Sequence, residues 1–173
     1  MNSNIKYLIE SFLDDEDEIK DTHIDIYKSL YVNLGLPSGT LWASCNLGAT
    51  SPEEYGLFYQ WGDISGHKPG EFDFNVNDYN KRFNDSEYVF NGTCQLKEKN
   101  DAAYIESEGI ARIPTSKQIN ELIKNCKMNW TTLNGVIGVE FIGINGNSIF
   151  FPASGNCDGM TLYDETKCVN IWS

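Results

Sequence analysis

The clearest periodic pattern in the chain lies between Ile113 and Cys126. Thr115 is an expected helix N-cap, and Gln118 stands three residues later, at the spacing of a capping box. Beyond it, one stripe of apolar side chains recurs at helical spacing: Ile119, Leu122, Ile123 and Cys126. The pattern predicts a helix that starts at Thr115 and buries this stripe.

Two β-hairpins are predicted on either side of this helix. The first joins Tyr31–Leu34 to Thr40–Ala43 through a Leu-Pro-Ser-Gly turn, and the second joins residues 136–144 to residues 148–151 through Asn145-Gly146. Residues 63–100 show no sustained periodicity and are expected to form a long, side-chain-packed loop region. The stretch from residue 155 onward is also expected to be a polar loop. These predicted elements indicate a compact α+β domain with one irregular, loop-rich face.

The N-terminal residues 1–13 carry a second helical stripe, after which residues 14–29 form an acidic linker and residues 30–173 form the domain. Eight acidic residues and one lysine lie between Glu10 and Asp25, which accounts for most of the net charge of -12. Two alternatives are open for the stripe: a helix docked on its own domain, or an anchor that docks on another protein. The expected partner-docking residues are Ile5, Leu8, Ile9, Phe12 and Leu13.

Charge and composition exclude several classes of function. The negative charge argues against nucleic acid, because phosphate backbones reward Lys and Arg. No apolar run is long enough for membrane insertion, and the N-terminus has no signal-peptide pattern, which indicates a cytoplasmic protein or a virion component. Five cysteines without a CxxC pair favour free thiols, although Cys157 and Cys168 would be able to pair in an oxidising environment.

The sequence offers no assembled catalytic constellation. The two histidines stand far from any nucleophile motif, and neither a phosphate-binding loop nor a dinucleotide fingerprint is present, so neither catalysis nor a cofactor is expected. A weak calcium alternative exists at Asp73, Asn75 and Asn77, whose oxygen donors alternate as in a calcium loop. The glycine and glutamate of an EF-hand are missing there, so a strand or loop is favoured.

Aromatic and acidic residues in the predicted loops are the candidates for ligand binding. Exposed rings stack on sugars or anchor protein partners. Asp158, Asp164 and Glu165 form an acidic group in the final loop, for which a solvated face is favoured over a calcium-assisted glycan site. The candidate ligand-binding residues are Phe72, Phe74, Tyr79, Phe83, Asp158, Tyr163 and Asp164.

Six segments, in this order, resemble the major paralogous domain family, first described in Fibrobacter succinogenes and common in gut bacteria and their phages. They read YVNLGLPSGTLWASCNLGATSPEEYG, FYQWGD, NDAAY, ARIPTSKQINELIKNC, WTTLNGV and NGNSIFFPASG. The segment beginning at Arg112 also resembles the RLPTEAEW segment of sulfatase-modifying factors. The resemblance implies a C-type-lectin-like fold, a twisted antiparallel sheet with one main helix under long loops, and it implies that Trp42, Trp61 and Trp130 belong to the core.

The sequence departs from that family pattern in two places. Residues 156–159 read Asn-Cys-Asp-Gly where family members carry an aromatic residue and Arg or Tyr, and family sequences continue for several strands past Trp172-Ser173. The family's C-terminal strands are therefore expected to be absent, and a truncated product, completion by a second chain and a self-sufficient short version are all open. One sheet edge and the Trp42 and Trp61 side of the core are then expected to be open.

Two functions follow from these patterns. The first is a non-catalytic binding or display module that presents its loops to a glycan or protein ligand. The second is a structural component of a larger assembly, of virion or cell-surface type, anchored through the N-terminal helix.

Overall fold

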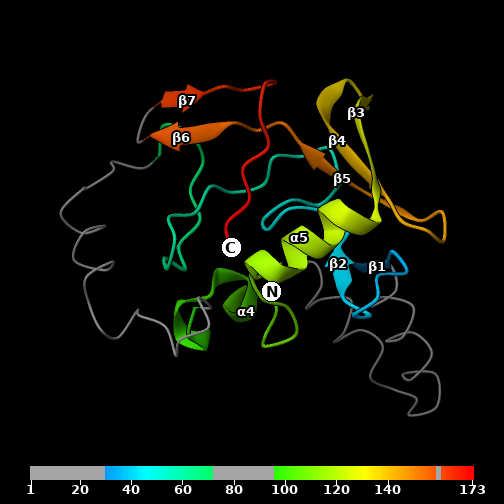
Figure 1. The fold of residues 1–173 in the computed structure, drawn as a ribbon. Helices are drawn as coiled ribbons and strands as arrows, with labels where there is room; N and C mark the ends of the chain where they lie inside the picture. The colour runs from blue at the N-terminus through cyan, green and yellow to red at the C-terminus, as the bar shows by residue number, and fades with distance from the viewer. Residues whose placement is uncertain (1–29, 72–95, 159–160) are drawn as a thin grey trace, which may run out of the picture.

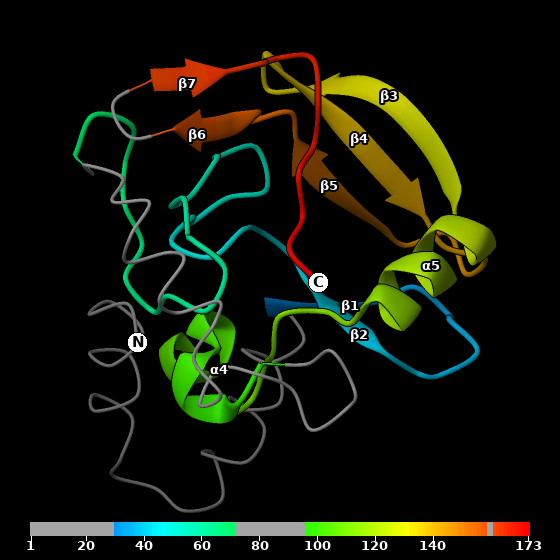
Figure 2. The same ribbon diagram turned by 60° about the vertical axis from the view of Figure 1, so that its left-hand side comes forward.

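The computed structural model describes residues 30–71, 96–158 and 161–173, and the expected N-terminal helix and acidic linker lie outside these ranges. The described residues form a small α+β protein whose sheets are all antiparallel (Figures 1 and 2). Among them, no helix is long and apolar enough to span a membrane. The strands are β1 (Tyr31–Asn33), β2 (Leu41–Ala43), β3 (Lys127–Leu133), β4 (Val136–Ile142), β5 (Ser148–Pro152), β6 (Asn156–Asp158) and β7 (Thr161–Tyr163).

Both predicted hairpins are present, as the pairs β1–β2 and β4–β5. Strand β3 was not predicted, and it adds a third strand beside β4. Asn134 and Gly135 join β3 to β4 with φ angles of 48° and 87°. Two consecutive left-handed residues are typical of the type I′ turn, whose twist matches that of paired strands. The Asn-Gly turn therefore closes a hairpin with β3 as its first strand.

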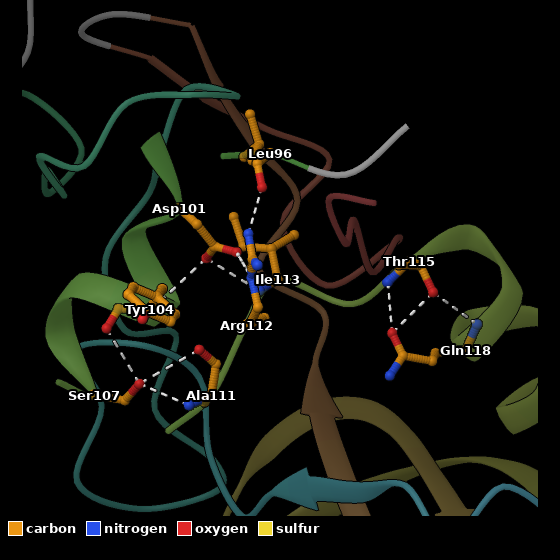
Figure 3. Close-up of polar contacts among 9 residues, drawn as sticks. All are labelled: Leu96, Asp101, Tyr104, Ser107, Ala111, Arg112, Ile113, Thr115 and Gln118. Carbon is orange, nitrogen blue, oxygen red and sulfur yellow. Dashed lines mark hydrogen bonds and ion pairs between the residues drawn. The ribbon is translucent and has the colours of Figure 1, made fainter. Parts of the chain in front are cut away.

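The predicted helix is confirmed as α5 (Ser116–Asn125), with Thr115 and Gln118 in a reciprocal capping box (Figure 3). Leu122 is fully buried, and Ile119 and Cys126 pack against the same core. Ile123, expected in the buried stripe, is 52% exposed. It follows Leu122 by about 100° around the helix axis, which turns its side chain away from the sheet.

The core lies between α5, the β1–β2 hairpin and one face of the β3–β4–β5 sheet. Its buried members are Leu34, Leu36, Trp42, Leu122, Val139, Phe141 and Ile149. Phe151 meets both Trp42 and Phe141 edge to face, with ring centroids 6.1 and 5.6 Å apart. Edge-to-face pairs stabilise a core beyond the area that they bury.

The expectations for the tryptophans are partly wrong. Trp42 and Trp61 are buried, so this side of the core is closed, whereas Trp130 is 54% exposed and does not belong to the core. The final residues of the chain run back across the domain, where the Trp172 indole donates to the Tyr59 carbonyl at 2.8 Å. The Ser173 hydroxyl also lies 3.0 Å from that of Ser116, at the start of α5.

The turn between β4 and β5 joins the sheet to β1. The amides of Asn145 and Asn147 both donate to the Asn33 carbonyl, each at 2.8 Å. A β-carbon at Gly143 would overlap the Leu34 carbonyl oxygen, so the two backbones are in direct contact at this point. Only a glycine permits so close an approach.

A short helix missed by sequence reasoning, α4 (Ala102–Glu106), follows the single-turn helix η1 (Glu98–Asn100). Asp101 between them is fully buried. Its carboxylate accepts hydrogen bonds from the backbone N–H groups of Tyr104 and Ile113 and from Nε of Arg112, at 3.0–3.1 Å (Figure 3). The Arg112 guanidinium also donates to the Leu96 carbonyl and lies 5.4 Å from the centre of the Tyr104 ring. Asp101 thus fastens α4 to the segment that leads into α5.

Replacing Asp101 by Ala should lower the free energy of unfolding by about 3 kcal/mol, because the substitution leaves Nε of Arg112 and two half-buried N–H groups without their acceptor. Urea denaturation of the full chain measures this loss. The matched control is Asp158→Ala on the exposed end of β6, which should change stability by less than about 0.5 kcal/mol. Equal effects of the two substitutions would contradict the role given to Asp101.

Candidate functional site

The segment after β5, expected to be a polar loop, begins with the hairpin β6–β7. That expectation is wrong for residues 156–158 and 161–163, because Cys157 and Leu162 are half-buried between exposed neighbours and give each strand an inner and an outer face. The hairpin lies apart from α5 in both views (Figures 1 and 2).

The strand register gathers four exposed side chains on the outer face of this hairpin. Asn156 pairs with Tyr163, and Asp158 pairs with Thr161. Directly paired residues point to the same side of a sheet, and residues two apart share a face. An amide, a carboxylate, a hydroxyl and an aromatic ring with 47% of its surface exposed therefore lie together. We call these residues, Asn156, Asp158, Thr161 and Tyr163, the outer face.

Backbone hydrogen bonds hold the hairpin to the main sheet. Ala153 donates to the Ile137 carbonyl of β4 at 2.8 Å, and Thr166 donates to the Ala153 carbonyl, also at 2.8 Å. Gly155 donates to Cys168 at 3.1 Å, and its φ angle of 68° is in the left-handed region. A β-carbon at Gly155 would overlap the Tyr163 carbonyl oxygen, so the start of β6 and the end of β7 touch through their backbones.

Asp164 follows directly after Tyr163 and shapes the turn that ends the hairpin. Its φ angle is 53°, and its carbonyl accepts from the N–H groups of Lys167 and Cys168. Its carboxylate lies 3.7 Å from the Lys167 ammonium group, an exposed ion pair that contributes little stability. Asp164 therefore borders the outer face, with part of its charge compensated.

Two ionisable groups near the hairpin have raised pKa values. Burial raises the pKa of Tyr55, and its hydrogen bond with Glu165 raises it further, which links residues 52–56 to the turn after β7. Burial also raises the pKa of the Cys157 thiol, and the charge of Asp158 adds to this effect. Neither Cys157 nor Cys168 is part of a disulfide in the structure. A thiol with a raised pKa is mostly protonated at neutral pH and is a poor nucleophile.

Of the predicted ligand-binding residues, the structure places Asp158 and Tyr163 on one face and Asp164 beside them. Phe72, Phe74, Tyr79 and Phe83 lie outside the described residues, as do the calcium candidates Asp73, Asn75 and Asn77. The described segment that ends at residue 71 runs beside β6 in both views (Figures 1 and 2). Within the described ranges, no group of three or more His, Cys, Asp or Glu side chains is arranged to hold a metal ion.

Sequence reasoning missed Asn156 and Thr161. Each stands two residues from a predicted site residue in the same strand, Asp158 or Tyr163. A period-two reading of residues 156–163 would have grouped all four. With only one apolar residue in each strand, the pattern was too short to distinguish from a polar loop.

The outer face suits a ligand rich in hydroxyl groups. Asn156 and Thr161 both donate and accept, the Asp158 carboxylate accepts, and the Tyr163 ring offers an apolar surface. Cys157 alternates with these residues and lies on the other side of the hairpin.

The sequence matches no family model, and neither a curated protein nor a solved structure matches it. The proposed function therefore rests on the geometry of the described residues.

Gly155→Ala should destabilise the hairpin, because the added methyl group meets the Tyr163 carbonyl and the left-handed φ angle disfavours alanine. We expect the amide protons of residues 156–158 and 161–163 to exchange at least tenfold faster while those of β4 remain protected, as hydrogen exchange with NMR detection would show. Gly70→Ala is the matched control, since Gly70 also has a positive φ angle but open space around it. Unchanged exchange in the Gly155 variant would contradict the contact.

Proposed function

We propose that this protein is a non-catalytic carbohydrate-binding module that recognises its ligand through the outer face of the β6–β7 hairpin. The observation that carries the proposal is the register that places Asn156, Asp158, Thr161 and Tyr163 together and exposed. The α+β frame and the resemblance of six sequence segments to the major paralogous domain family support a C-type-lectin-like scaffold beneath this face.

Sugar recognition combines an apolar contact with directional hydrogen bonds. An exposed tyrosine ring packs against the C–H groups on one face of a pyranose, while side chains around it bond to the hydroxyl groups. Tyr163 supplies such a ring, and Asn156 on the neighbouring strand supplies both a donor and an acceptor beside it. Asp158 and Thr161 provide further partners one step along the hairpin.

The charge around the outer face selects among sugars. Asp158 and Asp164 carry negative charge at this end of the molecule, and Lys167 compensates only in part. Like charges repel, so uronic acids, sialic acids and sulfated sugars are disfavoured. Neutral or amino sugars are the class of ligand that fits.

A glycan array probed with the full-length protein tests the proposal. We expect binding to neutral or amino sugars, and we expect Tyr163→Ala to weaken it at least tenfold. Tyr163→Phe should retain most of the affinity because it keeps the ring. Asp158→Asn should lower the affinity several-fold while leaving the fold intact.

Trp130→Ala is the matched control, since Trp130 is also an exposed aromatic side chain but lies on β3. This variant should bind as the parent does. An array without signal on any neutral or amino sugar would overturn the proposal, and so would equal losses in the Tyr163 and Trp130 variants.

A further inference from the structure

The core face of the main sheet continues past the core to an open edge at β3. Two cross-strand rows show this continuation: Met128, Phe141 and Ile149 form one, and Trp130, Val139 and Phe151 form the other. In both rows the residues from β4 and β5 are buried or half-buried, yet Met128 and Trp130 remain 58% and 54% exposed. Residues in one row point to the same side of a sheet, so the apolar layer of the core is uncovered along β3.

The surface beside this strand is basic, although the protein as a whole is acidic. The last turn of α5 leads through Cys126 into β3, and both Lys124 and Lys127 are exposed at this junction, next in sequence to the exposed Ile123. The one acidic residue of α5, Glu121, accepts two hydrogen bonds from Ser38, at 2.9 Å from its N–H group and 2.6 Å from its hydroxyl. Lys127 alternates with Met128 along β3 and so points to the opposite face of the sheet, which leaves Lys124 as the lysine beside the apolar strip at the α5–β3 junction.

We propose that the chain's own N-terminal segment, residues 5–18, docks on this strip, which consists of Ile123, Lys124, Met128 and Trp130. The segment complements it in both respects. Its apolar stripe, Ile5, Leu8, Ile9, Phe12 and Leu13, matches the exposed Met128 and Trp130 side chains. Five consecutive acidic residues, 14–18, follow the stripe and match Lys124.

The linker between the segment and the domain is long enough for this contact. Residues 19–29 provide 11 residues, which span up to about 35 Å when extended. A compact domain of 144 residues has a radius of gyration of about 15 Å, so it measures roughly 40 Å across. The segment therefore reaches well over the surface of its own domain, and its effective concentration there exceeds that of a separate chain.

Site-specific photo-crosslinking in the full-length protein tests this docking. A benzophenone amino acid placed at position 128 should, after irradiation, crosslink to residues 1–18, as mass spectrometry of the digest would show. The same probe at position 41 is the matched control, since Leu41 is also exposed but lies on β2. An equal mixture of isotope-labelled and unlabelled chains distinguishes crosslinks within one chain from crosslinks between chains.

Substitutions separate the apolar and the charged contributions. The double variant Leu8→Asp with Phe12→Asp should reduce the crosslink yield at least fivefold. Lys124→Glu should reduce it several-fold, whereas Lys117→Glu, at the opposite end of α5, should leave it unchanged. Tyr163→Ala should also leave it unchanged, which separates this proposal from carbohydrate binding.

Crosslinks within one chain to residues 1–18 would support the docking. Crosslinks between chains, whether to a second β3 or to another chain's N-terminal segment, would overturn it. Absence of any crosslink to residues 1–18, or equal yields from positions 128 and 41, would overturn it as well.

Discussion

The rest of the structure depends on the contact between the backbone at Leu34 and the backbone at Gly143. The β1–β2 sheet meets the β3–β4–β5 sheet there, and β1–β2 would be marginal alone, because a two-stranded ribbon buries too little surface to be stable in water. The missing side chain at Gly143 lets the two backbones touch, and the amides of Asn145 and Asn147 fix the contact through the Asn33 carbonyl. Leu34 is thereby placed fully inside the core, where it joins Leu122 of the helix and Phe141 of the sheet.

The position of the outer face of the hairpin depends on these two joined sheets. Strand β5 ends at Pro152. The hydrogen bond from the Ala153 N–H group to the Ile137 carbonyl of β4 then fixes the start of the segment that leads into β6. Gly155 then brings the two hairpin strands together, and strand alternation turns Tyr163 outward and Leu162 inward. The same alternation directs Met128 and Trp130 toward the uncovered part of the core layer. The exposed aromatic side chains Tyr163 and Trp130 thus belong to two different sheets, with different neighbours and different proposed roles.

Much of the frame could be predicted because its signals are local. The Thr115–Gln118 capping box marks the start of α5, and the Asn145-Gly146 turn marks the β4–β5 hairpin. Burial depended on distant residues and was predicted less well. Trp130 is of a residue type that is often buried, but it is exposed because no described element covers it on β3. In the candidate site, Asp158 and Tyr163 were predicted from their residue types. Asn156 and Thr161 join them only through the pairing of β6 with β7. Each of these strands has a single apolar residue, which is too little to predict the pairing from the sequence.

The contact between the two sheets is tested most directly by comparing the free energies of unfolding of the Gly143→Ala and Gly146→Ala variants. Gly146 lies in the same turn with open space around it, so its substitution should cost only the strain of a left-handed alanine, about 1 kcal/mol. Gly143→Ala must push the two backbones apart, and urea denaturation followed by tryptophan fluorescence should show a loss at least about 2 kcal/mol larger. Equal losses in the two variants would show that the contact at Leu34 does not hold the two sheets together.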